Sequence, residues 1–83
     1  MKKVARIVED EAQIAELLSD YLRNDGFDTV VLLSGERVVQ SVMQTPPDIV
    51  LLDIMLPVKS GVEICREIRK FSEVPIIFIT AKV

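Results

Sequence analysis

Acidic residues directly follow two apolar stretches, and acids in that setting can bind a metal ion or attack phosphorus. Glu9 and Asp10 follow the first apolar run, and Asp53 follows the unbroken run at 49–52. Carboxylate oxygens suit Mg²⁺, and a carboxylate can form an aspartyl phosphate. Thr80 ends another apolar run and adds a hydroxyl that can hydrogen-bond a phosphoryl group. The residue types favour phosphoryl transfer to Asp53, with Mg²⁺ offsetting the repulsion between the acids.

These side chains need a scaffold that brings distant segments to one edge. Short apolar runs alternate with segments of helical periodicity, which predicts strand-helix-strand units. Strands are expected at about 3–8, 27–32, 48–53 and 74–80. Unbroken apolar strands are typical of a sheet covered on both faces. The predicted fold class is therefore α/β, an open parallel sheet with helices on both faces, whose ligands bind beyond the carboxyl ends of the strands.

Three helices are expected between these strands. The first carries an apolar stripe at steps of three and four, made of Ile14, Leu17, Leu18, Tyr21 and Leu22. It is expected to end near Gly26, which can take the left-handed conformation. Ser34 is expected to be the N-cap of the second helix. The inner face of that helix is predicted to hold Val38, Val39, Val42 and Met43, and the third helix to carry Val62, Ile64, Cys65, Ile68 and Phe71.

A simpler interpretation of the acids is available. Glu9-Asp10-Glu11 alone is typical of an acidic turn that stabilises a helix N-terminus. Asp53 before a turn and Thr80 at a strand end are also ordinary placements. A capping turn does not require two further strand ends to point toward it, however. The joint placement of these residues therefore favours a shared site.

Composition limits the other possibilities. The 83 residues allow one domain, here 1–83, and 49% hydrophobic with 28% charged residues predicts a globular core. No apolar run approaches the roughly 20 residues of a membrane span, and Cys65 is the only cysteine, so we expect a cytoplasmic protein. The formal charge of −3 gives no basic bias toward nucleic acid. The chain contains no histidine, so a phosphoryl donor must be another molecule.

Several motifs occur in an order and spacing that resemble one protein family. They are Ile7-Val8-Glu9-Asp10-Glu11, Leu51-Leu52-Asp53-Ile54-Met55-Leu56-Pro57, Ser60-Gly61 and Thr80-Ala81-Lys82. Together they resemble the receiver domain of bacterial two-component response regulators. Segments 44–48 and 65–69 are similar to OmpR/PhoB-type regulators with a winged-helix output domain. The resemblance implies a flavodoxin-like, CheY-like fold with strand order 2-1-3-4-5.

The resemblance also implies roles for individual residues. Asp53 would take a phosphoryl group from a sensor histidine kinase. Asp10 and Asp53 would bind Mg²⁺ directly, Glu9 would bind it through water, and Met55 would offer its backbone carbonyl. Thr80 would be the switch hydroxyl, and Pro57 and Gly61 would shape the loop beside Asp53. In a longer parent protein, such a receiver would control a DNA-binding domain that regulates transcription, and the chain would accept a phosphoryl group without independent enzymatic turnover.

The sequence departs from the family pattern in two places. It ends at Val83, so we expect an incomplete fold that lacks the last helix-strand-helix and the lysine and aromatic residue found there. Strand four would then be an apolar edge, which predicts a homo-oligomer through that edge. Arg6 lies where the family has an aliphatic residue. Burial of an unpaired guanidinium is costly, so we expect Arg6 to reach an edge or the strand to be altered.

Two other functions stay open. The chain can be a signalling-inert truncated fragment that folds or assembles as an oligomer, and the missing lysine favours this alternative. A hydrolase with an aspartyl-phosphate intermediate is a weaker one. Such phosphatases usually carry a second acid two residues after the nucleophile, where this sequence has Met55, and the glycines form no phosphate-binding cluster.

Overall fold

The strands and helices alternate along the chain as the sequence predicts. The computed structural model describes residues 2–80. Its elements are β1 (Val4–Val8), α1 (Ala12–Asn24), β2 (Asp28–Leu32), α2 (Val38–Gln44), β3 (Ile49–Asp53), α3 (Gly61–Arg69) and β4 (Ile76–Ile79). The first three strands each begin one residue later than predicted. β4 is shorter than predicted at both ends. It begins only after Pro75, because proline has no backbone N–H to donate to a sheet.

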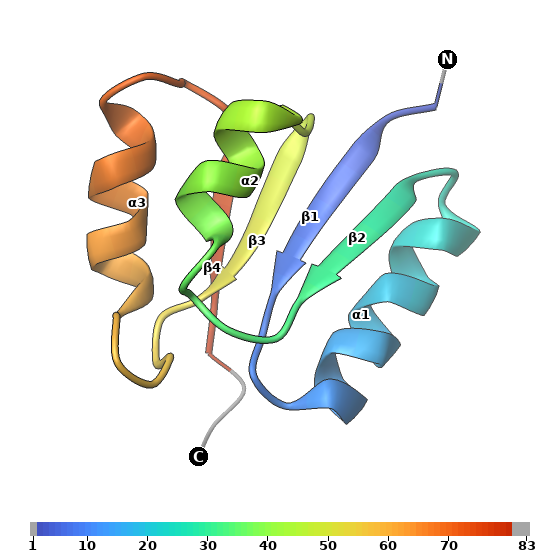
Figure 1. The fold of residues 1–83 in the computed structure, drawn as a ribbon. Coiled ribbons are helices and arrows are strands. Elements are labelled where there is room, and N and C mark those ends of the chain that lie inside the picture. Colours follow the sequence, from blue (N-terminus) through green and yellow to red (C-terminus); the bar gives the residue numbers. More distant parts are fainter. Residues whose placement is uncertain (1, 81–83) are drawn as a thin grey trace.

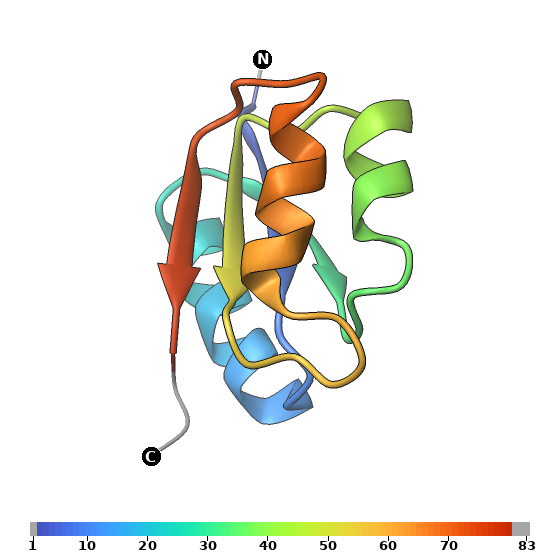
Figure 2. The same cartoon turned by 90° about the vertical axis from the view of Figure 1, so that its left-hand side faces the viewer.

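The strands form one parallel sheet in the order β2-β1-β3-β4. α1 covers one face of the sheet, and α2 and α3 cover the other (Figure 1). This arrangement confirms the predicted α/β fold class. All the strands run in the same direction, so the loops that follow β1 and β3 lie at one end of the sheet (Figure 2).

The main core lies between the sheet and the pair α2 and α3. Its fully or nearly buried members are Val8, Val38, Val42, Val50, Leu52, Leu56, Ile64 and Ile68. Ile64 and Ile68 lie one turn apart on α3, so both point toward the sheet. Ser60 begins this helix, since its side chain accepts a hydrogen bond from the Glu63 N–H at 3.3 Å. The core therefore fixes α3 against β3, the strand that ends at Asp53.

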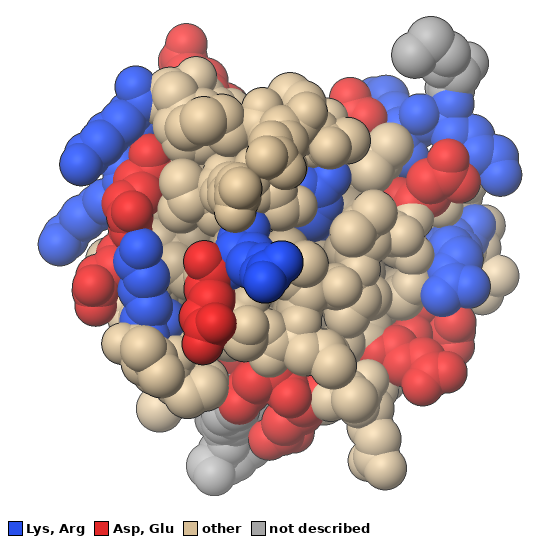
Figure 3. Space-filling model, viewed as in Figure 1, with Lys and Arg blue, Asp and Glu red and all other residues tan. Residues whose placement is uncertain are grey.

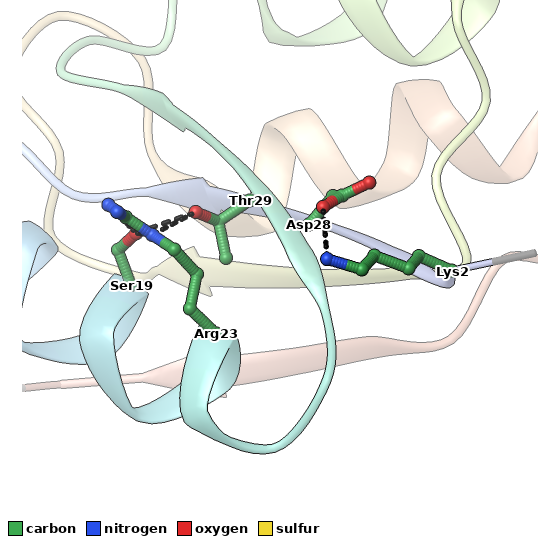
Figure 4. Close-up of polar contacts among 5 residues, drawn as sticks. All are labelled: Lys2, Ser19, Arg23, Asp28 and Thr29. Carbon is green, nitrogen blue, oxygen red and sulfur yellow. Dashed lines mark hydrogen bonds and ion pairs between the residues drawn. The ribbon is translucent and has the colours of Figure 1, made fainter.

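α1 contacts the sheet through small residues rather than through the whole predicted stripe. Leu17 and Tyr21 are 59% and 71% exposed, while Ala15 and Ser19 are buried. The Ser19 hydroxyl lies 2.6 Å from Thr29 Oγ1 of β2, and the Arg23 side chain donates to Ser19 (Figure 4). These polar contacts satisfy the hydroxyls and turn the helix toward Ser19. The predicted inner positions of Leu17 and Tyr21 are therefore wrong, whereas Gly26 takes the expected positive φ of 94°.

The start of α2 also differs from the prediction. Its N-cap is Arg37, which makes no side-chain capping hydrogen bond, so Ser34 is not the N-cap. Gly35 is buried beside α3, and a Cβ added there would lie 2.8 Å from Ile64 Cδ1. This close packing holds segment 33–37 in turns and delays the helix. Met43, predicted to face inward, is exposed.

Arg6 is buried within a regular strand, which corrects both predicted outcomes. It pairs in register with residues on both neighbouring strands and is 1% exposed. Its guanidinium donates to Ser41 Oγ at 2.7 Å and to the Thr45 carbonyl oxygen at 2.8 Å. Burial lowers the pKa of Arg6 from its ordinary value. The hydrogen bonds to Ser41 of α2 and to Thr45, the C-cap residue of that helix, offset much of the free-energy cost of burying the guanidinium.

The surface carries charges of both signs. Lysine and arginine side chains alternate with aspartate and glutamate around the margin of the face in Figure 3, and the area over α2 is largely uncharged. Lys2 and Asp28 form one exposed ion pair at 3.8 Å (Figure 4). Within residues 2–80, no helix has the length and apolar character that a membrane crossing requires.

Candidate functional site

Three acidic side chains meet at the carboxyl end of the sheet. β1 and β3 are adjacent parallel strands, so Glu9 and Asp10 after β1 come close to Asp53 at the end of β3. One carboxylate oxygen from each residue lies within 4.8 Å of the other two. Glu9 and Asp53 have no exposed surface, and Asp10 is partly exposed. The structure thus places together the three acids that the sequence predicted to share a site.

Local backbone bonds hold two of these carboxylates in place. Glu9 Oε2 accepts a hydrogen bond from the Glu11 N–H at 2.8 Å, and Asp53 Oδ1 accepts one from the Met55 N–H at 3.0 Å. Both bonds span two residues and fix the carboxylate over the turn that follows its strand. Glu11, the N-cap of α1, makes no side-chain capping bond. The Glu11 side chain therefore does not cap α1.

The geometry of the cluster fits a small hard cation. Mg²⁺ holds oxygen ligands at about 2.1 Å, so two direct ligands lie at most about 4.2 Å apart. The 4.8 Å limit of the cluster is only slightly wider. A small shift of one side chain, or a water between the ion and one acid, closes the difference. Buried carboxylates of like charge repel one another, so a divalent cation would also stabilise the group electrostatically.

The other two predicted site residues lie next to Asp53 in the fold. Met55 donates its backbone N–H to Asp53 Oδ1, and its side chain is exposed. Thr80 is exposed and follows Ile79, which pairs in register with Asp53. The carbonyl role of Met55 and the switch role of Thr80 stay predictions. The rest of the Thr80-Ala81-Lys82 motif lies outside the described residues.

The end of the loop from β3 to α3 packs closely against the backbone at the end of β3. Gly61 donates its N–H to the Ile54 carbonyl oxygen at 3.0 Å. A Cβ at position 61 would lie 2.3 Å from the Asp53 carbonyl oxygen, so only glycine fits there without displacement. The expectation that Gly61 belongs to this loop has a structural basis. No local pattern predicts the positive φ of 70° at Val58, because a β-branched residue is a poor candidate for that conformation.

The fold and the site define a class of protein, a parallel α/β sheet that carries an acidic cluster beyond its strand ends. A comparison with protein-family models matches residues 5–83 to the response regulator receiver domain. The chain therefore belongs to the response regulator receiver domain family.

Similar proteins agree with this family. The transcriptional regulatory protein BaeR of Escherichia coli O6:H1 is 49% identical over 77 residues, covering 93% of this chain and 32% of BaeR. The DNA-binding response regulator MtrA of Mycobacterium tuberculosis is 44% identical over 82 residues, covering 99% of this chain and 36% of MtrA. The chain thus spans about a third of the length of these curated relatives.

A solved structure agrees with the fold. The BeF3-activated N-terminal receiver domain of Klebsiella pneumoniae RstA superimposes with a TM-score of 0.88 at 36% identity. The match covers 96% of this chain and 68% of that one. The sheet and helices described here are therefore those of a receiver domain, of which this chain covers a part.

Proposed function

We propose that the chain is a phosphoacceptor in which Asp53 takes a phosphoryl group from a histidine kinase. The observation that carries this proposal is the meeting of Glu9, Asp10 and Asp53 within 4.8 Å in a member of the receiver family. Asp10 and Asp53 would hold Mg²⁺ directly, with Glu9 acting through water and Met55 through its carbonyl. Bound Mg²⁺ would neutralise the acids and the phosphoryl oxygens during transfer.

The chemistry requires one nucleophilic oxygen and accurate positioning. A carboxylate oxygen of Asp53 forms a bond to phosphorus while the bond from phosphorus to the donor nitrogen breaks, which leaves an acyl phosphate on Asp53. The Met55 N–H fixes the rotation of the carboxylate through Oδ1. Thr80, at the adjacent strand end, would donate its hydroxyl to the new phosphoryl group. The phosphoryl group would stay on Asp53, so the chain would act as an acceptor without independent turnover; Met55 at the position where aspartyl-phosphate hydrolases usually carry a second acid supports this.

The burial of Asp53 determines how a donor reaches it. Asp53 and Glu9 have no exposed surface, whereas Asp10 is partly exposed. A donor would therefore approach past Asp10, and the loops after β1 and β3 must open slightly to admit it. Such movement belongs to loops, which lack the packing that holds the strands.

The partners follow from the family. BaeR is named a transcriptional regulator and MtrA a DNA-binding response regulator, and both are about three times as long as this chain. We infer that the parent of this receiver likewise controls a DNA-binding output domain in the cytoplasm, in response to a sensor kinase. The receiver itself would serve as the input of that switch.

Incubation with a small phosphodonor tests the proposal directly. With Mg²⁺ and a phosphoramidate donor, intact-mass analysis is expected to detect the addition of one phosphoryl group. The gain should disappear when the metal is chelated, because the acids then repel the incoming phosphoryl oxygens. Absence of modification in the presence of Mg²⁺ would contradict this function and favour the signalling-inert alternative.

We also propose that the 83-residue chain, taken alone, associates through β4. This strand is an edge of the described sheet, and Ile77 and Phe78 on its two faces are 50% and 42% exposed (Figure 2). An apolar edge strand offers unpaired backbone groups to a second copy. Sedimentation velocity should detect a dimer or larger species at micromolar concentration. A single monomeric species over that range would argue against this association.

A further inference from the structure

The loop beside Asp53 contains a strained residue. Val58 has a φ of 70°, and the Lys59 N–H donates to the Pro57 carbonyl oxygen across it at 2.7 Å. A hydrogen bond over two residues with a positive central φ defines the rare, strained form of the γ-turn. Valine is poorly suited to this conformation, because its branched Cβ crowds the backbone at positive φ. Val58 is 96% exposed, so its side chain gains no packing that would offset the strain.

The strain is retained because both ends of the loop are fixed. At the start, the Met55 N–H donates to Asp53 Oδ1. At the end, Gly61 donates to the Ile54 carbonyl oxygen and lies against the Asp53 backbone. Because these contacts fix both ends of the loop, the backbone between residues 55 and 60 must adopt a conformation that joins them. The strained turn lies in the middle of that stretch.

Two contacts on either side of Val58 limit how the loop can relax. Leu56 is buried in the core and anchors the first half of the loop. Lys59 forms an ion pair with Glu67 on α3, which anchors the second half. Both ion-pair partners are partly solvent-exposed, so this contact is weaker than the apolar one. A relaxed loop would therefore move Val58 and Lys59 and transmit the change toward Gly61, which lies against the Asp53 carbonyl oxygen.

We propose that Val58 is a positioning residue that sets the population of the metal-competent loop. The turn shown here accompanies the clustered acids, so it is the state that can hold Mg²⁺. Rotation of Val58 to negative φ relieves the strain and disturbs the contact of Gly61 with the Asp53 backbone, which positions the Asp53 carboxylate. The loop then exchanges between the two states, and only the strained one binds the ion well. This inference rests on the proposed magnesium site.

Substitution of Val58 by glycine tests whether strain at this residue controls the populations of the two loop states. Glycine adopts positive φ about as readily as negative φ, so Val58→Gly removes the bias against the observed turn. When a competent state is only partly populated, the apparent dissociation constant rises by the inverse of that population. A loop that spends about one-third of its time in the observed turn would therefore bind about threefold more weakly than a loop held there.

An NMR titration with Mg²⁺ tests this expectation on the whole chain. We expect Val58→Gly to tighten Mg²⁺ binding by about threefold or more. Val58→Ala is the matched control, because it removes the exposed side chain but keeps a Cβ, and its affinity should stay within about twofold of the parent. Relaxation dispersion of the Met55 and Lys59 amides should show exchange in the parent chain that Val58→Gly suppresses. A purely structural effect would shift thermal stability and leave these two readouts unchanged.

The outcomes distinguish this inference from the proposed function. Equal Mg²⁺ affinity in the parent and Val58→Gly would overturn the role of Val58 and leave the magnesium site standing. Weaker binding in Val58→Gly would also overturn it, because relief of the strain at positive φ would then fail to raise the population of the loop state that binds Mg²⁺. If neither protein binds Mg²⁺, both the site and the inference are contradicted.

Discussion

Asparagine in place of Asp53 is expected to abolish phosphoryl incorporation from a small donor. The amide has no anionic oxygen to attack phosphorus, and it removes one of the charges that would hold Mg²⁺. The rate of modification should fall by about 100-fold or more. Intact-mass analysis after timed incubation with Mg²⁺ and phosphoramidate measures the loss, and peptide mapping locates the modified residue in the parent chain.

The Asp53→Asn substitution is conservative for the fold. An asparagine carbonyl oxygen can accept the Met55 N–H as Oδ1 of Asp53 does. Removing one of three clustered carboxylates also lowers their repulsion, so the metal-free variant should unfold at an equal or higher temperature. Asp20→Asn makes the same chemical change on the exposed surface of α1 and should be modified at the parental rate. Persistent modification of Asp53→Asn would assign the nucleophile to another acid, with partly exposed Asp10 as the next candidate.

The position of the acidic site was predictable because strand direction alone determines it. Apolar runs identified β1 and β3, and parallel strands bring their carboxyl ends to one edge. Glu9, Asp10 and Asp53 needed no further information to be placed together. Errors of a residue or two in the strand bounds did not affect this result, since each acid directly follows its apolar run.

The faces of the helices depended on partners that the sequence does not reveal. A regular apolar stripe predicted that Leu17 and Tyr21 lie inward, but the Ser19–Thr29 hydroxyl contact turns α1 another way. Arg6 looked unfavourable in a buried strand until the hydroxyl of Ser41 and the carbonyl of Thr45 supplied its acceptors. In both cases, polar groups far apart in sequence decide which side chains are buried.

The loop after β3 was the least predictable part of the site. Its proline and glycine indicated a turn, but they did not indicate which residue takes positive φ. The strain falls on Val58 because the contacts at Asp53 and Gly61 fix the two ends of the loop. Tertiary constraints of this kind override local preference, and the sequence carries no direct sign of them.

Alanine at position 61 is expected to cause the largest loss of stability among single-methyl additions to this chain's glycines. The new Cβ would lie 2.3 Å from the Asp53 carbonyl oxygen and 3.0 Å from the Ile54 Cα. Both are backbone atoms, which cannot rotate away as a side chain can. The free energy of unfolding should fall by about 2–4 kcal/mol. Urea unfolding followed by circular dichroism measures this change.

Two other glycines supply matched comparisons for Gly61→Ala. At Gly26, an added Cβ meets nothing within 4 Å, so only the strain of its φ of 94° opposes alanine, at a cost of about 1 kcal/mol. At Gly35, the nearest atom is the tip of the Ile64 side chain, which can shift. We therefore expect Gly61→Ala to be the most destabilising of the three. Its displaced Asp53 carbonyl should also weaken Mg²⁺ binding, whereas Gly26→Ala should leave binding unchanged. Equal losses of stability at positions 26 and 61 would show that backbone conformation, and not the close approach to Asp53, makes glycine necessary there.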